Sequence, residues 1–244
     1  YGNVCLGKDA GDSLTTEIGS ICIGSNAGQK IGGGTTASDG QVFIGHSAGQ
    51  DIDTGEGNTA IGYNALTLED DGDFNTAVGW KALSVQEGTS GEVGNTVVGY
   101  QSGQFVTTAT GSTFIGAKAG QGITGAKLTG NNNTAIGASA GLLLQGAAVA
   151  NTIVGAFGSL SSVAGGTYNT AIGYLSGDTI TTGTNNVLVG MHAEASANDV
   201  TYEIVIGSGV DYSNAFAGGG TDTVRIGRAA EYMTGDLTSN TWAH

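Results

Sequence analysis

Aspartates in two neighbouring polar segments are the residues whose spacing could most directly support chemistry. Asp51 and Asp53 lie in one segment, and Asp70, Asp71 and Asp73 lie in the next. Clusters of carboxylate oxygens bind hard cations such as calcium. The spacing matches neither an EF-hand loop nor the glycine-aspartate nonapeptide of calcium-binding β-rolls. We therefore expect a solvated acidic patch here, with a calcium site as the alternative.

A series of aromatic residues is the candidate for ligand binding. Tyr63, Trp80 and Tyr100 each follow a glycine in an equivalent position. An exposed row of such rings could stack on sugars. However, a small residue stands three positions before two of them, Ala60 before Tyr63 and Ala77 before Trp80. This exchange of large for small predicts one shared, packed compartment and favours packing over sugar binding.

Nucleophilic catalysis has less support in the sequence. The segment Gly11-Asp12-Ser13-Leu14 matches a nucleophile motif of lipases and esterases, but acyl transfer also needs a base and an orienting acid. The Asp-x-x-His partner of such enzymes is missing, because Thr241 stands three residues before His244. His46, His192 and His244 lie far apart and predict no metal cluster. We therefore expect no catalytic residue, no cofactor and no enzyme.

The composition restricts the class of protein. The 244 residues include 46 Gly and no Pro, and 11% are charged. Regularly recurring aliphatic residues argue against disorder. The formal net charge of −14 disfavours nucleic acid and anionic lipid as partners. No apolar run is long enough for a bilayer span, and Tyr1 without a leader behind it suggests a fragment or processed product.

The dominant feature of the chain is a repeat. A pair formed by an aliphatic residue and a glycine recurs at intervals of 17 to 21 residues. A constant minimum length with small additions indicates one structural coil per unit, with insertions confined to a loop. The thirteen glycines are Gly7, Gly24, Gly45, Gly62, Gly79, Gly99, Gly116, Gly137, Gly155, Gly173, Gly190, Gly207 and Gly227.

The residues before each glycine predict a strand with two apolar faces. The residue just before it is always aliphatic, and a β-branched residue usually stands two positions earlier, which is the period of a strand. We expect this side to face the core. The position between them, occupied for example by Ala60 and Val97, is also apolar and predicts burial against a second copy. A threonine series resembling that of ice-binding solenoids then belongs to the core side: Thr59, Thr76, Thr96, Thr113, Thr134, Thr152 and Thr170.

These patterns predict an all-β, parallel β-solenoid of about 13 coils over residues 1–230, followed by a C-terminal extension over 231–244. Arg225 and Arg228 break the pattern in the final unit and predict a capping coil. Cys5 and Cys22 hold equivalent positions, so two stacked free thiols are favoured over a disulfide. The variable loops, where recognition would lie, are 32–40, 84–94, 107–111 and 124–132.

The units 58–66 (NTAIGYNAL), 75–83 (NTAVGWKAL) and 169–177 (NTAIGYLSG) resemble repeats of phage tail fibres and of trimeric autotransporter adhesin heads. The resemblance covers essentially the whole chain. It implies a left-handed parallel β-roll that packs as a homotrimer. The segment 225–244 is similar to the stretch that precedes the self-cleaving chaperone domain of many phage fibres, which implies a processing point near His244.

The expected function is a non-enzymatic structural and adhesive segment of a viral tail fibre, located in the virion or at a cell surface. Its expected partners are two further copies of itself and a host cell-surface glycan or protein. The alternatives are a polysaccharide-degrading tailspike and a bacterial trimeric adhesin head. A degrading enzyme needs a carboxylate pair at a defined separation, and no recurring strand position carries one.

Overall fold

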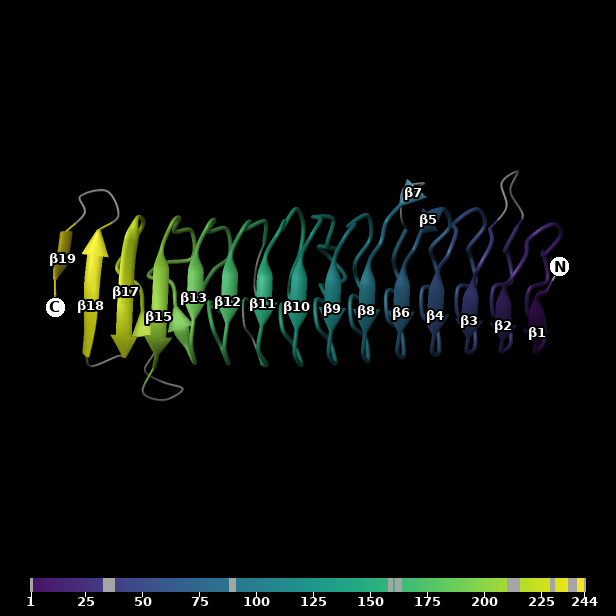
Figure 1. Ribbon diagram of the computed structural model, residues 1–244, viewed down its shortest axis with the longest axis horizontal. Coiled ribbons are helices and arrows are strands. Elements are labelled where there is room, and N and C mark those ends of the chain that lie inside the picture. Colours follow the sequence, from purple (N-terminus) through teal and green to yellow (C-terminus); the bar gives the residue numbers. More distant parts are fainter. Residues whose placement is uncertain are drawn as a thin grey trace.

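The computed structural model describes residues 2–32, 38–87, 91–157, 160, 164–209, 216–228, 231–236 and 241–243. Within this part of the chain all regular secondary structure is β, and no helix occurs. The chain winds into a rod with its two termini at opposite ends (Figure 1). The predicted all-β parallel solenoid is therefore confirmed.

One 15-stranded sheet runs along the rod. Its first thirteen strands pair in parallel, and the last two pair antiparallel. The chain makes about 11 turns, counted from β1 to β15, compared with the 13 coils that the repeats predicted. In order, the strands are β1 (Val4–Leu6), β2 (Ile21–Ile23), β3 (Val42–Ile44), β4 (Thr59–Ile61), β6 (Thr76–Val78), β8 (Thr96–Val98), β9 (Thr113–Ile115), β10 (Thr134–Ile136), β11 (Thr152–Val154), β12 (Thr170–Ile172), β13 (Val187–Val189), β15 (Ile204–Ser208), β17 (Thr223–Arg228), β18 (Glu231–Asp236) and β19 (Thr241–Ala243).

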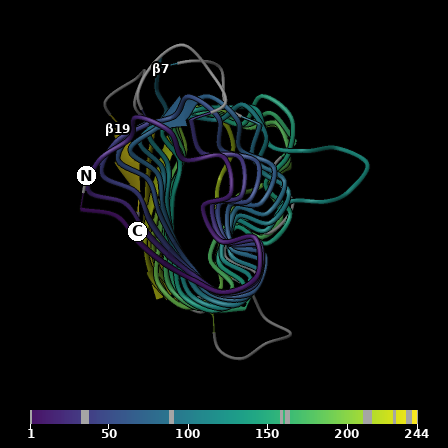
Figure 2. The same cartoon turned by 90° about the vertical axis from the view of Figure 1, so that its right-hand side faces the viewer.

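Two small sheets accompany the main one, formed by β5 (Gly72–Asp73) with β7 (Gly91–Glu92) and by β14 (Ala193–Glu194) with β16 (Phe216–Ala217). Viewed along the rod, the main strands superpose as one flat wall, and the remainder of each coil forms an irregular opposite wall (Figure 2). Equivalent residues pair across neighbouring coils, as Thr134 does with Thr152. Loops that differ in length project from the rod without disturbing this register.

The middle residue of each strand points into the coil, which corrects the predicted orientation. Ala60 and Val97 are fully buried within a single chain, whereas Ile115 and Ile136 are 40% and 38% exposed. The prediction placed the invariant aliphatic side in the core and expected a second copy to cover the middle position. It was wrong because both sides are apolar, and alternation alone does not say on which side the coil closes. The fully buried middle residues are Cys22, Phe43, Ala60, Ala77, Val97, Phe114, Ala135, Ile153, Ala171, Leu188 and Val205.

In four coils the interior is filled by a compensation of volumes between two positions. Where the middle residue is Phe43, the residue six positions later is Gly49, and a Cβ on that glycine would lie 2.6 Å from the phenylalanine ring. Where the middle residue is Ala60, the residue six positions later is Leu66, which is fully buried. The same exchange recurs in Phe114 with Gly120 and in Ala77 with Leu83. This keeps the core close-packed although its side chains vary widely in size.

The repeated glycine is fixed by contact between coils. Gly62 has a φ of +134°, and a Cβ placed on it would lie 2.5 Å from the carbonyl oxygen of Gly79 in the next coil. Carbon atoms of real side chains do not approach a carbonyl so closely, and L-residues rarely adopt this φ. Each glycine thus permits both the corner and the close stacking of the coils.

A column of asparagines runs through the buried start of the strands. Asn169 donates from Nδ2 to the Gly183 carbonyl at 2.8 Å, and its Oδ1 accepts the backbone N–H of Asn186 at 3.1 Å. One side chain therefore closes its own coil and links it to the next coil. The completely buried members are Asn58, Asn75, Asn95, Asn133, Asn151, Asn169 and Asn186. They satisfy backbone groups that would otherwise be buried without partners.

Replacing Asn169 by alanine should lower the free energy of unfolding by about 2 to 3 kcal/mol, because two buried backbone groups would lose their partners. Serine should be tolerated better, because Ser112 holds the equivalent position in its coil and accepts the backbone N–H of Asn133 at 3.2 Å. Urea unfolding followed by circular dichroism would compare the two variants. Equal losses for alanine and serine would contradict the proposed role of the side-chain acceptor.

The C-terminal end of the stack differs from the rest. Arg225 takes the interior position of β17 and donates to the backbone carbonyls of Ala217 and Gly218. The chain then reverses, so that β18 and β19 continue the sheet in antiparallel pairing. The guanidinium thus meets main-chain oxygens at the place where earlier coils bury an apolar side chain. The side chain of Arg228 lies outside the described residues.

The two cysteines are free and lie directly opposite each other on β1 and β2. Cys5 is exposed, whereas Cys22 is fully buried. Burial and the neighbouring Cys5 raise the pKa of the Cys22 thiol to about 12. Because the thiolate is the reactive form, Cys22 should be inert near neutral pH.

At pH 8 the native protein should react with about one equivalent of an aromatic disulfide reagent such as DTNB, at Cys5, and with two after unfolding in urea. Cys22 should stay unreactive in the folded protein at this pH, since its raised pKa leaves the thiol protonated. Absorbance of the released thiolate measures both phases. Two equally fast equivalents in the native state at pH 8 would contradict the placement of Cys22.

Candidate functional site

The outward side of the flat wall carries a row of partly exposed apolar residues. We call it the outward face and define it by the two residues that flank the inward-pointing middle residue in each of the thirteen parallel strands. Third residues such as Ile172 and Ile206 are each 41% exposed, although they are large and aliphatic. Their equivalents on neighbouring strands stand directly beside them, as Ile115 does beside Ile136. Monomeric proteins rarely expose a continuous apolar stripe of this length.

The threonine series forms the second stripe of the outward face. The sequence correctly predicted that the threonines share a side with the invariant aliphatics, but that side is the outer one. Thr96 and Thr152 are exposed, and the remaining five are half-buried. The threonines are therefore not part of the core edge. Each outward strand surface presents one hydroxyl-bearing residue and one aliphatic residue over the central seven coils.

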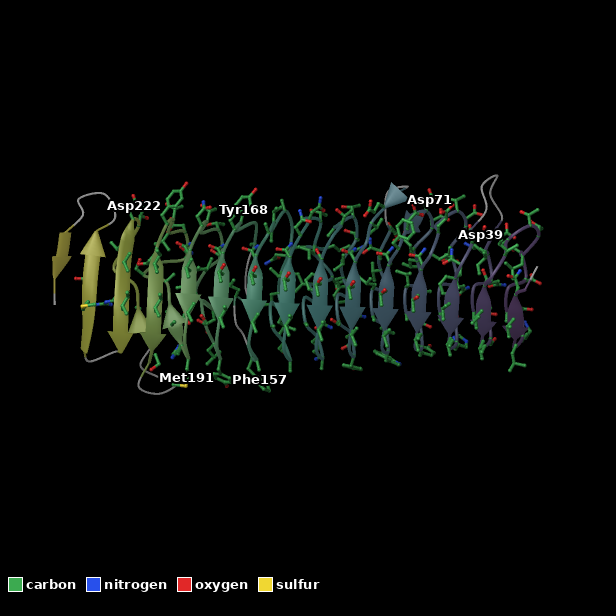
Figure 3. All side chains as sticks on the ribbon, viewed as in Figure 1. Asp39, Asp71, Phe157, Tyr168, Met191 and Asp222 are labelled. Atoms are coloured by element: carbon green, nitrogen blue, oxygen red, sulfur yellow. The ribbon has the colours of Figure 1, made fainter. Side chains whose placement is uncertain are left out.

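The aromatic residues after the glycines form a stacked row at one edge of the strands. The ring centroids of Tyr63 and Trp80 are 5.9 Å apart, and those of Trp80 and Tyr100 are 5.2 Å apart. His46 extends the row, 5.3 Å from Tyr63, and the Lys81 ammonium lies 4.6 Å from the centre of the Trp80 ring. Residues of equivalent corners, Phe157 and Met191, project from the same edge (Figure 3).

This geometry argues against sugar stacking along the row. Neighbouring rings are within 19° of parallel, so each inner ring covers the faces of the next, and mainly ring edges remain exposed. A sugar would need an open ring face. The predicted compartment shared with the middle strand residues is wrong, because Ala60 is buried inside the coil whereas Tyr63 is 45% exposed. The row instead extends the apolar outward face along its edge.

The five aspartates proposed for calcium lie on adjacent coils, and three of them have separate partners. Asp51 pairs with the Lys30 ammonium at 2.9 Å. Asp71 accepts the Thr54 hydroxyl at 2.6 Å, and Asp73 accepts the backbone N–H of Glu56 at 2.8 Å. A surface pocket of about 390 Å³ lies beside them and is lined by Lys30, Asp51, Leu68, Asp70 and Glu87.

Local crowding of charge is strongest at Asp70. Burial, followed by the carboxylates of Asp71 and Asp53, raises the pKa of Asp70 above its ordinary value. None of the five aspartates belongs to a described group of three potential ligands whose atoms lie within 4.8 Å of one another. With a lysine already placed on Asp51, the arrangement favours a solvated acidic patch over a calcium site.

The other residues considered for catalysis remain separate in the described structure. Ser13 lies in a turn at a coil corner, where its backbone N–H bonds to the Gln29 carbonyl at 3.1 Å. His46 belongs to the aromatic row, far along the rod from His192. His244 lies outside the described residues.

One group of potential metal ligands was not predicted from the sequence. Asp178, His192 and Glu194 come from two successive coils, and one potential ligand atom from each lies within 4.8 Å of the other two. The histidines do not gather with one another, but His192 gathers with two carboxylates. The signal was present in the spacing, because separations of 14 and 16 residues are close to the 17-residue coil that stacks such positions.

Comparison with protein-family models, with curated proteins and with solved structures finds no match to this chain. The described residues contain no helix that could cross a bilayer.

Proposed function

We propose that this chain is a non-enzymatic structural and adhesive segment of a viral tail fibre or similar appendage, in which three copies associate through their outward faces. The observation that carries the proposal is the row of partly exposed aliphatic residues along the flat wall. Burying such a row contributes about 25 cal/mol for each Å² of apolar area. Association of copies removes this surface from water along the whole rod.

Because the middle residues of the strands face inward, the proposed interface lies on the outward face. The reason for association, an exposed apolar side of the strands, is unchanged. The sequence assigned the interface to positions such as Ala60, which are filled from within one chain. The partly exposed aliphatic residues beside the glycines form the proposed interface instead, and the aromatic row lies next to them. The resemblance to fibre and adhesin repeats supports three as the number of copies and a left-handed coil.

Loops outside the outward face would then contact a host surface, since they stay exposed in such a trimer. An enzymatic role as a polysaccharide-degrading tailspike is less suited to the described residues. The closest carboxyl pair with a strongly perturbed member is Asp178 with Glu194, and Glu194 is only 2% exposed, so a sugar ring could not reach it.

Size-exclusion chromatography with light scattering tests the proposal. The expected mass is about three times the 24.0 kDa of one chain and should stay constant over a hundredfold dilution. A stable monomer at all concentrations would overturn the trimeric fibre.

A second candidate function is favoured by the outward threonine series alone. A flat, regular face of alternating hydroxyl and aliphatic residues is the kind of surface that ice-binding solenoids present. It would have to remain exposed, so this function requires a monomer. Thermal hysteresis of a monomeric protein would support it, and a trimer without hysteresis would exclude it.

A further inference from the structure

The group formed by Asp178, His192 and Glu194 lies where one corner stacks on the next. Asp178 follows Gly177 in the coil of β12, and the other two residues follow β13, in the coil stacked upon it. His192 comes directly after Met191, which marks this edge of the strands (Figure 3), and Glu194 follows two residues later. The site is independent of the outward face and of the proposed fibre role.

Backbone hydrogen bonds hold the two corners in register. The N–H of His192 donates to the Tyr174 carbonyl at 2.8 Å, and the N–H of Gly177 donates to the Ala193 carbonyl at 2.9 Å. The main chain of Glu194 is fixed by pairing of β14 with β16, where its carbonyl accepts the N–H of Gly218 at 2.8 Å. The three side chains therefore start from a rigid frame, as a preorganised site requires.

The Glu194 carboxylate is directed into the group by its own contacts. It accepts the Thr179 hydroxyl at 2.9 Å and the Thr179 backbone N–H at 3.2 Å. Glu194 is 2% exposed, whereas Asp178 and His192 are half-buried and open the group to solvent.

Two carboxyl groups share this small volume with the His192 imidazole. No lysine or arginine in the described part of the chain forms an ion pair with Asp178 or Glu194. Burial, followed by the charge of Asp178, raises the pKa of Glu194 to about 8. A divalent cation would supply the positive charge that the group lacks.

We propose that Asp178, His192 and Glu194 bind one divalent transition-metal ion of the zinc class and thereby clamp two successive coils together. One imidazole nitrogen and two carboxylate oxygens form a donor set that suits such ions better than calcium or magnesium, which prefer oxygen alone. Ligand atoms about 2.1 Å from a common ion lie within about 4.2 Å of each other, so the 4.8 Å group must contract slightly.

Titration calorimetry with zinc chloride, on the untagged full chain, tests the site. We expect one ion per chain and a raised melting temperature, with calcium chloride giving neither. His192→Asn removes the imidazole yet suits the left-handed φ of 54° at this position, and should weaken zinc binding at least about tenfold. His46→Asn, at the other described histidine, should bind zinc as the wild type does.

Asp178→Asn provides an independent variant if His192→Asn folds poorly, and it should also weaken zinc binding. Circular dichroism of the metal-free proteins confirms that the solenoid is intact. Absence of zinc binding at millimolar concentration, or unchanged affinity in either folded variant, would overturn the site. Equal binding of calcium and zinc would overturn the assignment to the zinc class.

Discussion

Replacing Gly62 by alanine should lower the free energy of unfolding by about 3 kcal/mol or more. The new Cβ would meet the Gly79 carbonyl oxygen at 2.5 Å and its carbon at 2.7 Å. These are backbone atoms of the next coil and cannot turn aside as a side chain would. The φ of +134° adds strain for any L-residue.

The effect should spread beyond one coil, because each coil of a solenoid is stabilised only by its neighbours. Gly125→Ala is the matched control: nothing lies within 4 Å of a Cβ placed there, and its backbone needs no left-handed φ. That variant should change stability by less than about 1 kcal/mol. Urea midpoints followed by circular dichroism compare the two, and equal midpoints would show that close stacking at the glycine column does not limit stability.

Replacing Ile115 and Ile136 together by lysine should convert the proposed trimer into a monomer of 24.0 kDa. These side chains are 40% and 38% exposed in a single chain, so the coil itself loses little when they become polar. In an interface between copies, each lysine would bury a charge without a partner, which costs several kcal/mol. Light scattering measures the mass, and circular dichroism checks the fold.

The matched control is Ile18→Lys with Leu68→Lys. These aliphatic residues are 50% and 39% exposed but lie outside the outward face, so the trimer should persist. If the control dissociated while the Ile115 and Ile136 variant stayed trimeric, copies would associate through another surface. The variant thus tests which face is used, separately from whether the wild type associates.

The repeat explains why so much of the fold could be predicted. The aliphatic-glycine pair located every strand of the parallel sheet, since a three-residue strand and its corner occupy the same place in each unit. Coil stacking also explains the invariant glycine, because no other residue fits between carbonyls of adjacent coils. The reversal into β18 and β19 left no periodic signal, and only the structure revealed it.

The candidate sites were harder to predict from the sequence because they depend on contacts between coils. Rings such as Tyr63 and Trp80 could be placed in one row, but their mutual stacking depends on side-chain orientation at the corner. Asp178 and Glu194 come from different coils whose loops have different lengths, which hides their proximity.

By itself, then, the sequence determined that this chain is an all-β solenoid, where its strands lie and which residue turns each corner, because these follow from local alternation and from a fixed period. Only the tertiary structure decided which face of the strands is inside. Both faces are apolar. Which of them is buried depends on how completely side chains of the opposite wall of the same coil fill the interior. Leu66 fills the space beside Ala60, and Gly49 leaves space for the ring of Phe43. The middle residues therefore pack within one chain, and the aliphatic residues beside the glycine face outward.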